Sequence, residues 1–256
     1  MKLNIHRQLF VAIAILTLIQ LGLPICAQSS KNFDGLGGED ITREVHEINL
    51  DRLKQGQYVL TYEEHHAEGV GESVFTLRQV SEGYLAVWEG INDTTEVYTD
   101  LEFRTEKIMI SDDDTALTVK RRDGLLIVRG IDAGRNIDKE LKLSSPHWFQ
   151  LLPLSLIPFT SSDRESVKFS MFDPYNLKVR DMQIEKKKRE TITLFETEYE
   201  TVKMAMRLRG LLTPFWKSEI WNAVGSGTHI QYEGLNVVPK LHKSKIYLKT
   251  VEFQPK

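Results

Sequence analysis

Histidines are the side chains of this sequence best suited to acid–base or metal chemistry. Beyond the N-terminal segment they stand at His46, His65, His66, His147, His229 and His242. The adjacent pair His65 and His66 would point to opposite faces of a strand, so the two rings cannot bind one ion together. No HExxH spacing occurs, and no cysteine follows Cys26. We therefore expect no metal and no cofactor, although a site assembled from distant strands stays open.

Carboxylates and serines are scattered rather than arranged. Asp112-Asp113-Asp114 separates two apolar runs and predicts a solvated hairpin turn, because a calcium loop needs further ligands at a set spacing. No serine stands in a G-x-S-x-G context. No pair of acids is singled out by position, so we assign no catalytic residue. A hydrolase acting on envelope material remains an alternative.

Two runs of basic residues could bind an anion. Lys120-Arg121-Arg122 precedes an Asp-Gly pair, and Lys186-Lys187-Lys188-Arg189 is expected at a turn between two strands. Turn cations are usually solvated, and their alternative is contact with lipid phosphates at a membrane surface. The formal charge of −3 argues against a nucleic-acid partner.

Large apolar side chains form the remaining group of candidate functional residues. Aromatic residues build the core of a β protein or line the mouth of a barrel that holds an apolar ligand. On the second interpretation the ligand-binding residues are Trp148, Phe149, Leu152, Trp216 and Trp221. On a regular strand Trp216 and Trp221, five apart, would point to opposite faces.

Short segments of alternating polarity must position these residues. Tyr58, Leu60 and Tyr62 share one face of a predicted strand, and so do Val202, Met204, Met206 and Leu208. Asp123-Gly124 predicts a tight hairpin between two such segments. Ten to twelve segments with turn residues between them predict an all-β fold: a curved antiparallel sheet, half-barrel or barrel-like. An outer-membrane barrel is the alternative, although many segments are short for it.

One segment breaks the alternation. Residues 146–159 are apolar almost throughout and predict one short helix, which Pro153 and Pro158 would kink or end. The segment is expected to be a buried plug, a lid over a cavity, or a docking patch.

The N-terminus indicates export. Lys2 and Arg7 precede a run of about 15 apolar residues that ends at Ile25-Cys26-Ala27, a pattern typical of a signal peptide cleaved after Ala27. A retained anchor and a lipoprotein acylated at Cys26 are the alternatives. We expect residues 1–27 to be the signal peptide, 28–42 a flexible leader, and 43–256 a single antiparallel β domain. Because residues 1–27 hold two cations and no acid, cleavage shifts the formal charge from −3 to −5.

A resemblance adds to this interpretation. The apolar stretch, then VKFSMFDPYN, then alternating strands, then Phe215 to Trp221 (FWKSEIW) follow in an order that resembles the domain-of-unknown-function 3108 family of exported bacterial proteins. More loosely, the chain is similar to the half-barrel lipoprotein carriers of the Gram-negative periplasm. The resemblance implies a curved antiparallel sheet around a helix, and it implies no activity and no site residue.

These observations favour a non-enzymatic periplasmic protein that binds or transfers an apolar, lipid-like molecule, with peripheral membrane contact as an added hypothesis. A structural or assembly factor is the main alternative. It would dock on an envelope partner through a sheet edge or through residues 146–159.

Overall fold

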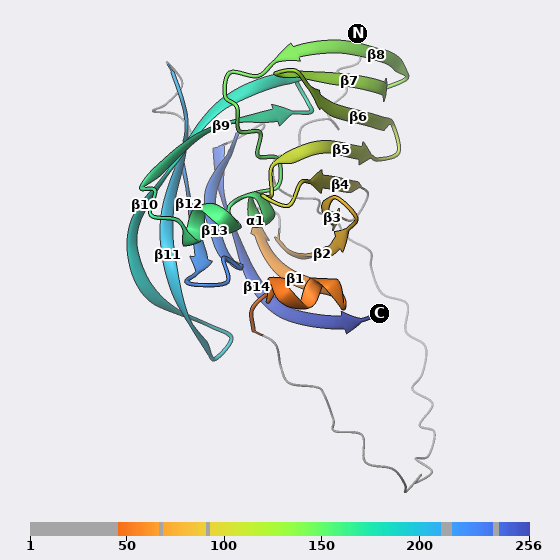
Figure 1. Ribbon diagram of the computed structural model, residues 1–256. Helices are drawn as coiled ribbons and strands as arrows, with labels where there is room; N and C mark the ends of the chain where they lie inside the picture. The colour runs from red at the N-terminus through yellow and green to blue at the C-terminus, as the bar shows by residue number, and fades with distance from the viewer. Residues whose placement is uncertain (1–45, 67–68, 91–92, 211–216, 238–240) are drawn as a thin grey trace, which may run out of the picture.

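The computed structural model describes residues 46–66, 69–90, 93–210, 217–237 and 241–256. In these ranges the strands form one 14-stranded antiparallel sheet that curves around a short helical segment (Figure 1). The expected fold is therefore confirmed. The predicted signal peptide and leader lie outside the described residues. Among the described residues, no helix is both long enough and apolar enough to cross a membrane.

The strands are β1 (Gly56–His66), β2 (Gly69–Val80), β3 (Gly83–Glu89), β4 (Thr94–Thr99), β5 (Thr105–Ser111), β6 (Thr115–Arg122), β7 (Leu125–Asp132), β8 (Arg135–Lys142), β9 (Ser166–Asp173), β10 (Lys178–Leu194), β11 (Thr197–Leu208), β12 (Lys217–Ala223), β13 (His229–Val237) and β14 (Leu241–Pro255). The helices are the 3-10 helix η1 (Leu50–Lys54), α1 (Leu152–Ser155) and α2 (Ile157–Ser161).

Two meanders make up the sheet. Strands β1 to β8 follow one another, strands β9 to β14 do the same, and β1 pairs with β14 to join the two groups. The chain leaves the first meander at β8 and enters the second at β9, so these consecutive strands lie at opposite edges of the sheet. The apolar segment predicted from the sequence spans this crossing.

Alternation places the core on the concave face. Tyr58, Leu60 and Tyr62 on β1 are fully buried, as expected. On β11, Met204 is fully buried while its neighbour Lys203 forms an ion pair with Glu219 at 2.8 Å. One face of each strand therefore packs inward and the other meets water, as period-two patterning requires.

The Asp-Gly hairpin is confirmed in detail. Asp123 and Gly124 both adopt positive φ, 50° and 78°, which is the geometry of a type I′ turn. The turn pairs Arg122 with Leu125 and so sets the register of β6 against β7.

Two local expectations are wrong. The basic run Lys186–Arg189 lies within the 17-residue strand β10, not at a turn, and the strand has a bulge between Lys186 and Lys188. Pro153 and Pro158 do not end the helix; each stands in the first turn of its own short helix. A proline fits there because the amide hydrogen it lacks has no partner within the helix at that position.

Candidate functional site

The two edges of the sheet meet without a ladder. In the described part of the chain, β8 and β9 share no strand pairing, so the sheet is unclosed. Side chains pack across the gap instead: Phe172 and Leu177 belong to the same buried cluster as Val119 and Val128 of the opposite edge. We call this line of contact the seam. An edge held by side chains opens at lower cost than one held by a hydrogen-bonded ladder.

Residues 143–150, here the seam segment, bridge the gap. Trp148 forms a parallel bridge with Ser170 of β9. The Phe149 amide donates to the Ser170 carbonyl at 3.1 Å, and the Ser170 amide donates to the His147 carbonyl at 2.8 Å. On the other side, the Thr105 amide of β5 donates to the Trp148 carbonyl at 3.3 Å. The segment therefore touches both halves of the sheet.

Gln150 completes the bridge through its side chain. Its amide nitrogen donates to the Phe172 carbonyl, and its amide oxygen accepts from the Phe172 amide, both at 3.0 Å. The same oxygen accepts from Trp148 Nε1 at 3.1 Å. The Gln150 side chain thus forms hydrogen bonds with both backbone groups of Phe172 on β9, and it orients the buried Trp148 indole. Sequence reasoning missed Gln150, because a lone glutamine beside an apolar run carries no periodic signal.

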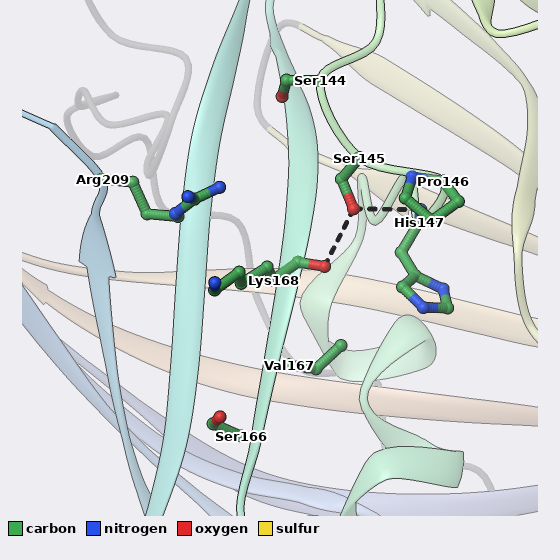
Figure 2. A pocket seen from close by; sticks show the side chains of 8 residues that line it. All are labelled: Ser144, Ser145, Pro146, His147, Ser166, Val167, Lys168 and Arg209. Carbon is green, nitrogen blue, oxygen red and sulfur yellow. Dashed lines mark hydrogen bonds between the residues drawn. The ribbon is translucent and has the colours of Figure 1, made fainter.

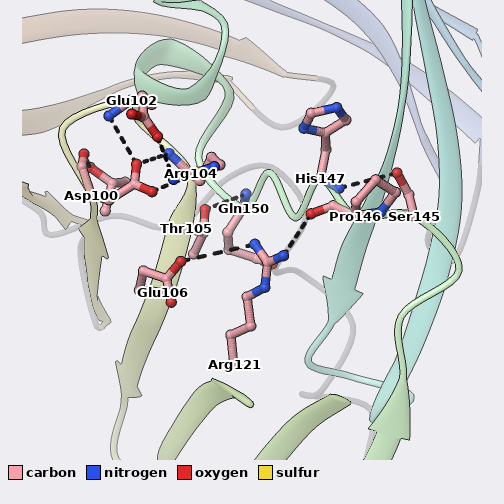
Figure 3. A network of polar contacts seen from close by, with 11 residues as sticks. Asp100, Glu102, Arg104, Thr105, Glu106, Arg121, Ser145, Pro146, His147 and Gln150 are labelled. Carbon is pink, nitrogen blue, oxygen red and sulfur yellow. Dashed lines mark hydrogen bonds and ion pairs between the residues drawn. The ribbon is translucent and has the colours of Figure 1, made fainter. Parts of the chain in front are cut away.

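A polar network links the seam segment to β5 and β6. The Arg121 guanidinium donates to the Pro146 carbonyl at 2.9 Å and lies 3.9 Å from Glu106 (Figure 3). Arg121 belongs to the first basic run singled out in the sequence. Its position shows that this cation serves the bridge between the edges and is not simply solvated.

Residues 151–161, here the plug, fill the concave face. Leu154, Leu156 and Ile157 are almost completely buried. Side chains of the seam segment and the plug reach all three buried clusters of the interior: Trp148 one of them, Leu154 and Ile157 a second, and Leu156 a third. Together, the seam segment and the plug therefore contact all three buried apolar clusters of the interior.

A short buried network fastens the end of the plug. Asn222 Nδ2 of β12 donates to Thr160 Oγ1 at 3.0 Å, and Asn222 Oδ1 lies 3.1 Å from His229 Nδ1. Burial lowers the pKa of His229 to about 4, so its imidazole is neutral at pH 7. Since Asn222 Oδ1 can only accept, Nδ1 carries the hydrogen of this neutral ring.

The predicted ligand-binding residues do not form one group. Trp148 and Phe149 are buried on the inside of the sheet, and half-buried Leu152 packs against the cluster that contains Phe149. Trp221 faces the outer side, where Lys203 Nζ lies 4.6 Å from its ring and Glu190 accepts from its Nε1 at 2.7 Å. Trp216 lies outside the described residues. Ligand binding by these residues stays a prediction, and the structure places only the first three near one another.

A shallow groove of about 390 Å³ lies between the seam segment and β9. It is lined by Ser144, Ser145, Pro146, His147, Ser166, Val167, Lys168 and Arg209. In the view of Figure 2, His147 and Arg209 lie on opposite sides of this groove, with Lys168 between them. Within the ranges given above, no group of three or more His, Cys, Asp or Glu side chains is arranged to hold a metal ion.

Comparison with known proteins identifies the fold and no activity. No family model matches the chain, and no curated protein matches it. A β-barrel-like protein of the domain of unknown function DUF1849 from Brucella abortus is similar in structure, with a TM-score of 0.57 and 11% identity over 79% of this chain and 99% of that one. At this identity the likeness shows a shared fold alone.

Two other solved structures are more distant. The hypothetical lipoprotein YmcC from Escherichia coli matches with a TM-score of 0.35 and 8% identity, over 78% of this chain and 85% of that one. An exported protein with a YmcC-like fold from Bacteroides fragilis matches with a TM-score of 0.31 and 11% identity, over 77% and 96%.

Proposed function

We propose that this is an exported, non-enzymatic protein of the cell envelope that takes up an apolar, lipid-like molecule on its concave face in place of the plug. The observation that carries the proposal is the plug itself. It is a short apolar segment that packs against the buried apolar clusters inside an unclosed sheet. The N-terminal sequence supports the periplasm as the location, and membership of the 3108 family stays a hypothesis.

The plug is weakly built as a helix. Its two helices have four and five residues, and neither has a side-chain hydrogen bond at its N-cap. Helices this short are marginal alone and depend on the surface against which they pack. An acyl chain on that surface would replace the same apolar contacts, so exchange of plug for ligand requires little net loss of burial.

A buried hydroxyl in the plug supports this exchange. Ser155 is 2% exposed, and no hydrogen-bond partner for its Oγ is present in the part of the chain that the structure describes. An unsatisfied buried hydroxyl costs about 1–3 kcal/mol, which a residue selected only for packing would avoid. We call the form in which the plug covers the concave face the closed form. The closed form is therefore less stable than its apolar contacts alone would make it.

The docking alternative is less well supported. Residues 146–159 would have to present an apolar face to a partner, but Trp148, Leu154 and Leu156 are fully buried. The free edge β8 is mostly exposed and carries charges along its length (RNIDKELK). Charged edge strands discourage pairing with another chain.

Titration with a fluorescent fatty acid tests the proposal. We expect saturable binding with a dissociation constant in the micromolar range, about −8 kcal/mol. The absence of saturable binding up to about 100 μM would contradict it.

Ser155→Ala should favour the closed form. Removing the unsatisfied hydroxyl is expected to stabilise the protein by about 1 kcal/mol, to raise the melting temperature, and to weaken fatty-acid binding about fivefold. The matched control is Ser161→Ala in α2, whose Oγ lies at the surface and makes one long contact of 3.4 Å with the Gly225 carbonyl. That change should leave both quantities nearly unaltered. If the two variants behave alike, the hydroxyl at 155 does not regulate the plug.

A further inference from the structure

The groove between the seam segment and β9 has the composition of an anion site. Its lining includes two cations, Lys168 and Arg209, the imidazole of His147, and three serines, with no carboxylate among them. Arginine, lysine and hydroxyl groups are the usual donors to a phosphate group.

The two cations differ from others in this part of the sheet. Lys187 and Arg207 both bind the Glu185 carboxylate, at 2.6 and 2.9 Å. Neither Lys168 nor Arg209 has an ion-pair partner among the residues that the structure describes. Their side chains extend from β9 and from the end of β11 over the ribbon of β10 (Figure 2). Their charges are therefore available to a ligand in the groove.

The surrounding backbone is well ordered by its own hydrogen bonds. Ser145 Oγ donates to the Lys168 carbonyl at 3.0 Å and accepts from the His147 amide at 3.2 Å. Ser144 Oγ donates to the Asp181 carboxylate, which does not itself line the groove. Ser166 is exposed at the start of β9 and lines the groove, so its hydroxyl can donate to a ligand there.

His147 stands at one end of the groove. Burial, and then the charges of Arg164, Arg121 and Arg104, lower the pKa of its imidazole. A dianion placed there would raise the same pKa.

We propose that this groove binds a phosphate group, with Lys168 and Arg209 as its principal ligands and Ser166 as a hydroxyl donor. The proposal does not require the plug to move, because no residue of 151–161 lines the groove. The phosphate belongs either to a lipid headgroup or to a soluble phosphate compound.

Isothermal titration with inorganic phosphate and sedimentation with phosphatidylglycerol vesicles test the proposal. We expect phosphate to bind with a dissociation constant of about 1 mM or below. In Lys168→Gln/Arg209→Gln the binding should weaken at least about tenfold. The control Lys187→Gln/Arg207→Gln removes the same net charge from cations that already have a carboxylate partner, and it should bind phosphate like the wild type.

The phosphate titration and the vesicle sedimentation together distinguish the two possible sources of the phosphate group. If phosphate and vesicles both bind, and phosphate displaces the protein from the vesicles, the headgroup is the source. If phosphate binds and vesicles do not, the source is a soluble phosphate compound. Binding of neither, or equal weakening in the two double variants, would overturn the proposal. Fatty-acid binding is unaffected in every case, so this result is distinguishable from failure of the proposed function.

Discussion

Oxidised Ser144→Cys/Ser170→Cys protein is expected to lose fatty-acid binding at least about tenfold, and reduction is expected to restore it. The two hydroxyl oxygens lie 3.0 Å apart, one on the chain that leaves β8 and the other on β9. Sulfur atoms at these positions need only a small adjustment to form a disulfide across the seam. If the seam must open for the plug to leave, this bond holds the closed form.

The reduced double variant is the matched control, since it has the same residues without the bond. Cys26→Ser in the full chain removes the single natural cysteine and any competing disulfide. Equal binding by the oxidised and reduced forms would show that a ligand enters without opening the seam.

Met204→Asp is expected to have the largest effect on stability. Met204 is fully buried between β10 and β12, within a cluster that includes Phe169 and Ile220. A carboxylate there has neither water nor a partner, so the free energy of unfolding should fall by about 4 kcal/mol or more. Urea denaturation measures the change through the midpoint, provided that the slope is unaltered.

Lys203→Gln, on the next residue and the opposite face, supplies the comparison. It removes the ion pair with Glu219 and the contact with the Trp221 ring, and it keeps most of the side chain. The expected cost is about 1 kcal/mol. Similar costs at the two positions would contradict the inward and outward faces described for β11.

Strands with one buried face and one solvent-exposed face could be predicted from the sequence. β1 and β11 alternate because the sheet has a core side and a solvent side, and Asp123-Gly124 has the residues that a type I′ turn requires. Tyr58, Leu60 and Tyr62 on β1 and Val202, Met204 and Met206 on β11 are buried as predicted, whereas Leu208, predicted on the same face, is half-buried.

Other strands carry no such signal. β8 is an edge whose faces are both largely exposed, so its charges do not alternate with apolar residues. β13 begins with His229 and Ile230, which are both buried, so alternation is absent for the opposite reason. In β10 a bulge at Lys187 changes the phase within a basic run that looks like a turn.

The candidate site was harder to predict than the fold. Trp148 and Phe149 were identified from their size, and their separate clusters depend on pairing with Ser170, which is distant in sequence. Composition alone groups Trp221 with them, whereas the register of β12 puts Trp221 on the other face of the sheet. Side-chain bridges such as those of Gln150 and Arg121 arise only once the two edges meet.

Quenching by a brominated fatty acid in single-tryptophan variants tests the central claim most directly. One variant keeps Trp148, on the inside of the sheet, and the other keeps Trp221, on the outside; phenylalanine replaces the remaining tryptophans, and far-UV circular dichroism checks the fold. Bromine quenches by contact, so a ligand on the concave face should quench Trp148 and leave Trp221 unaffected. Equal quenching of the two, or quenching of Trp221 alone, would contradict exchange of the plug for a ligand.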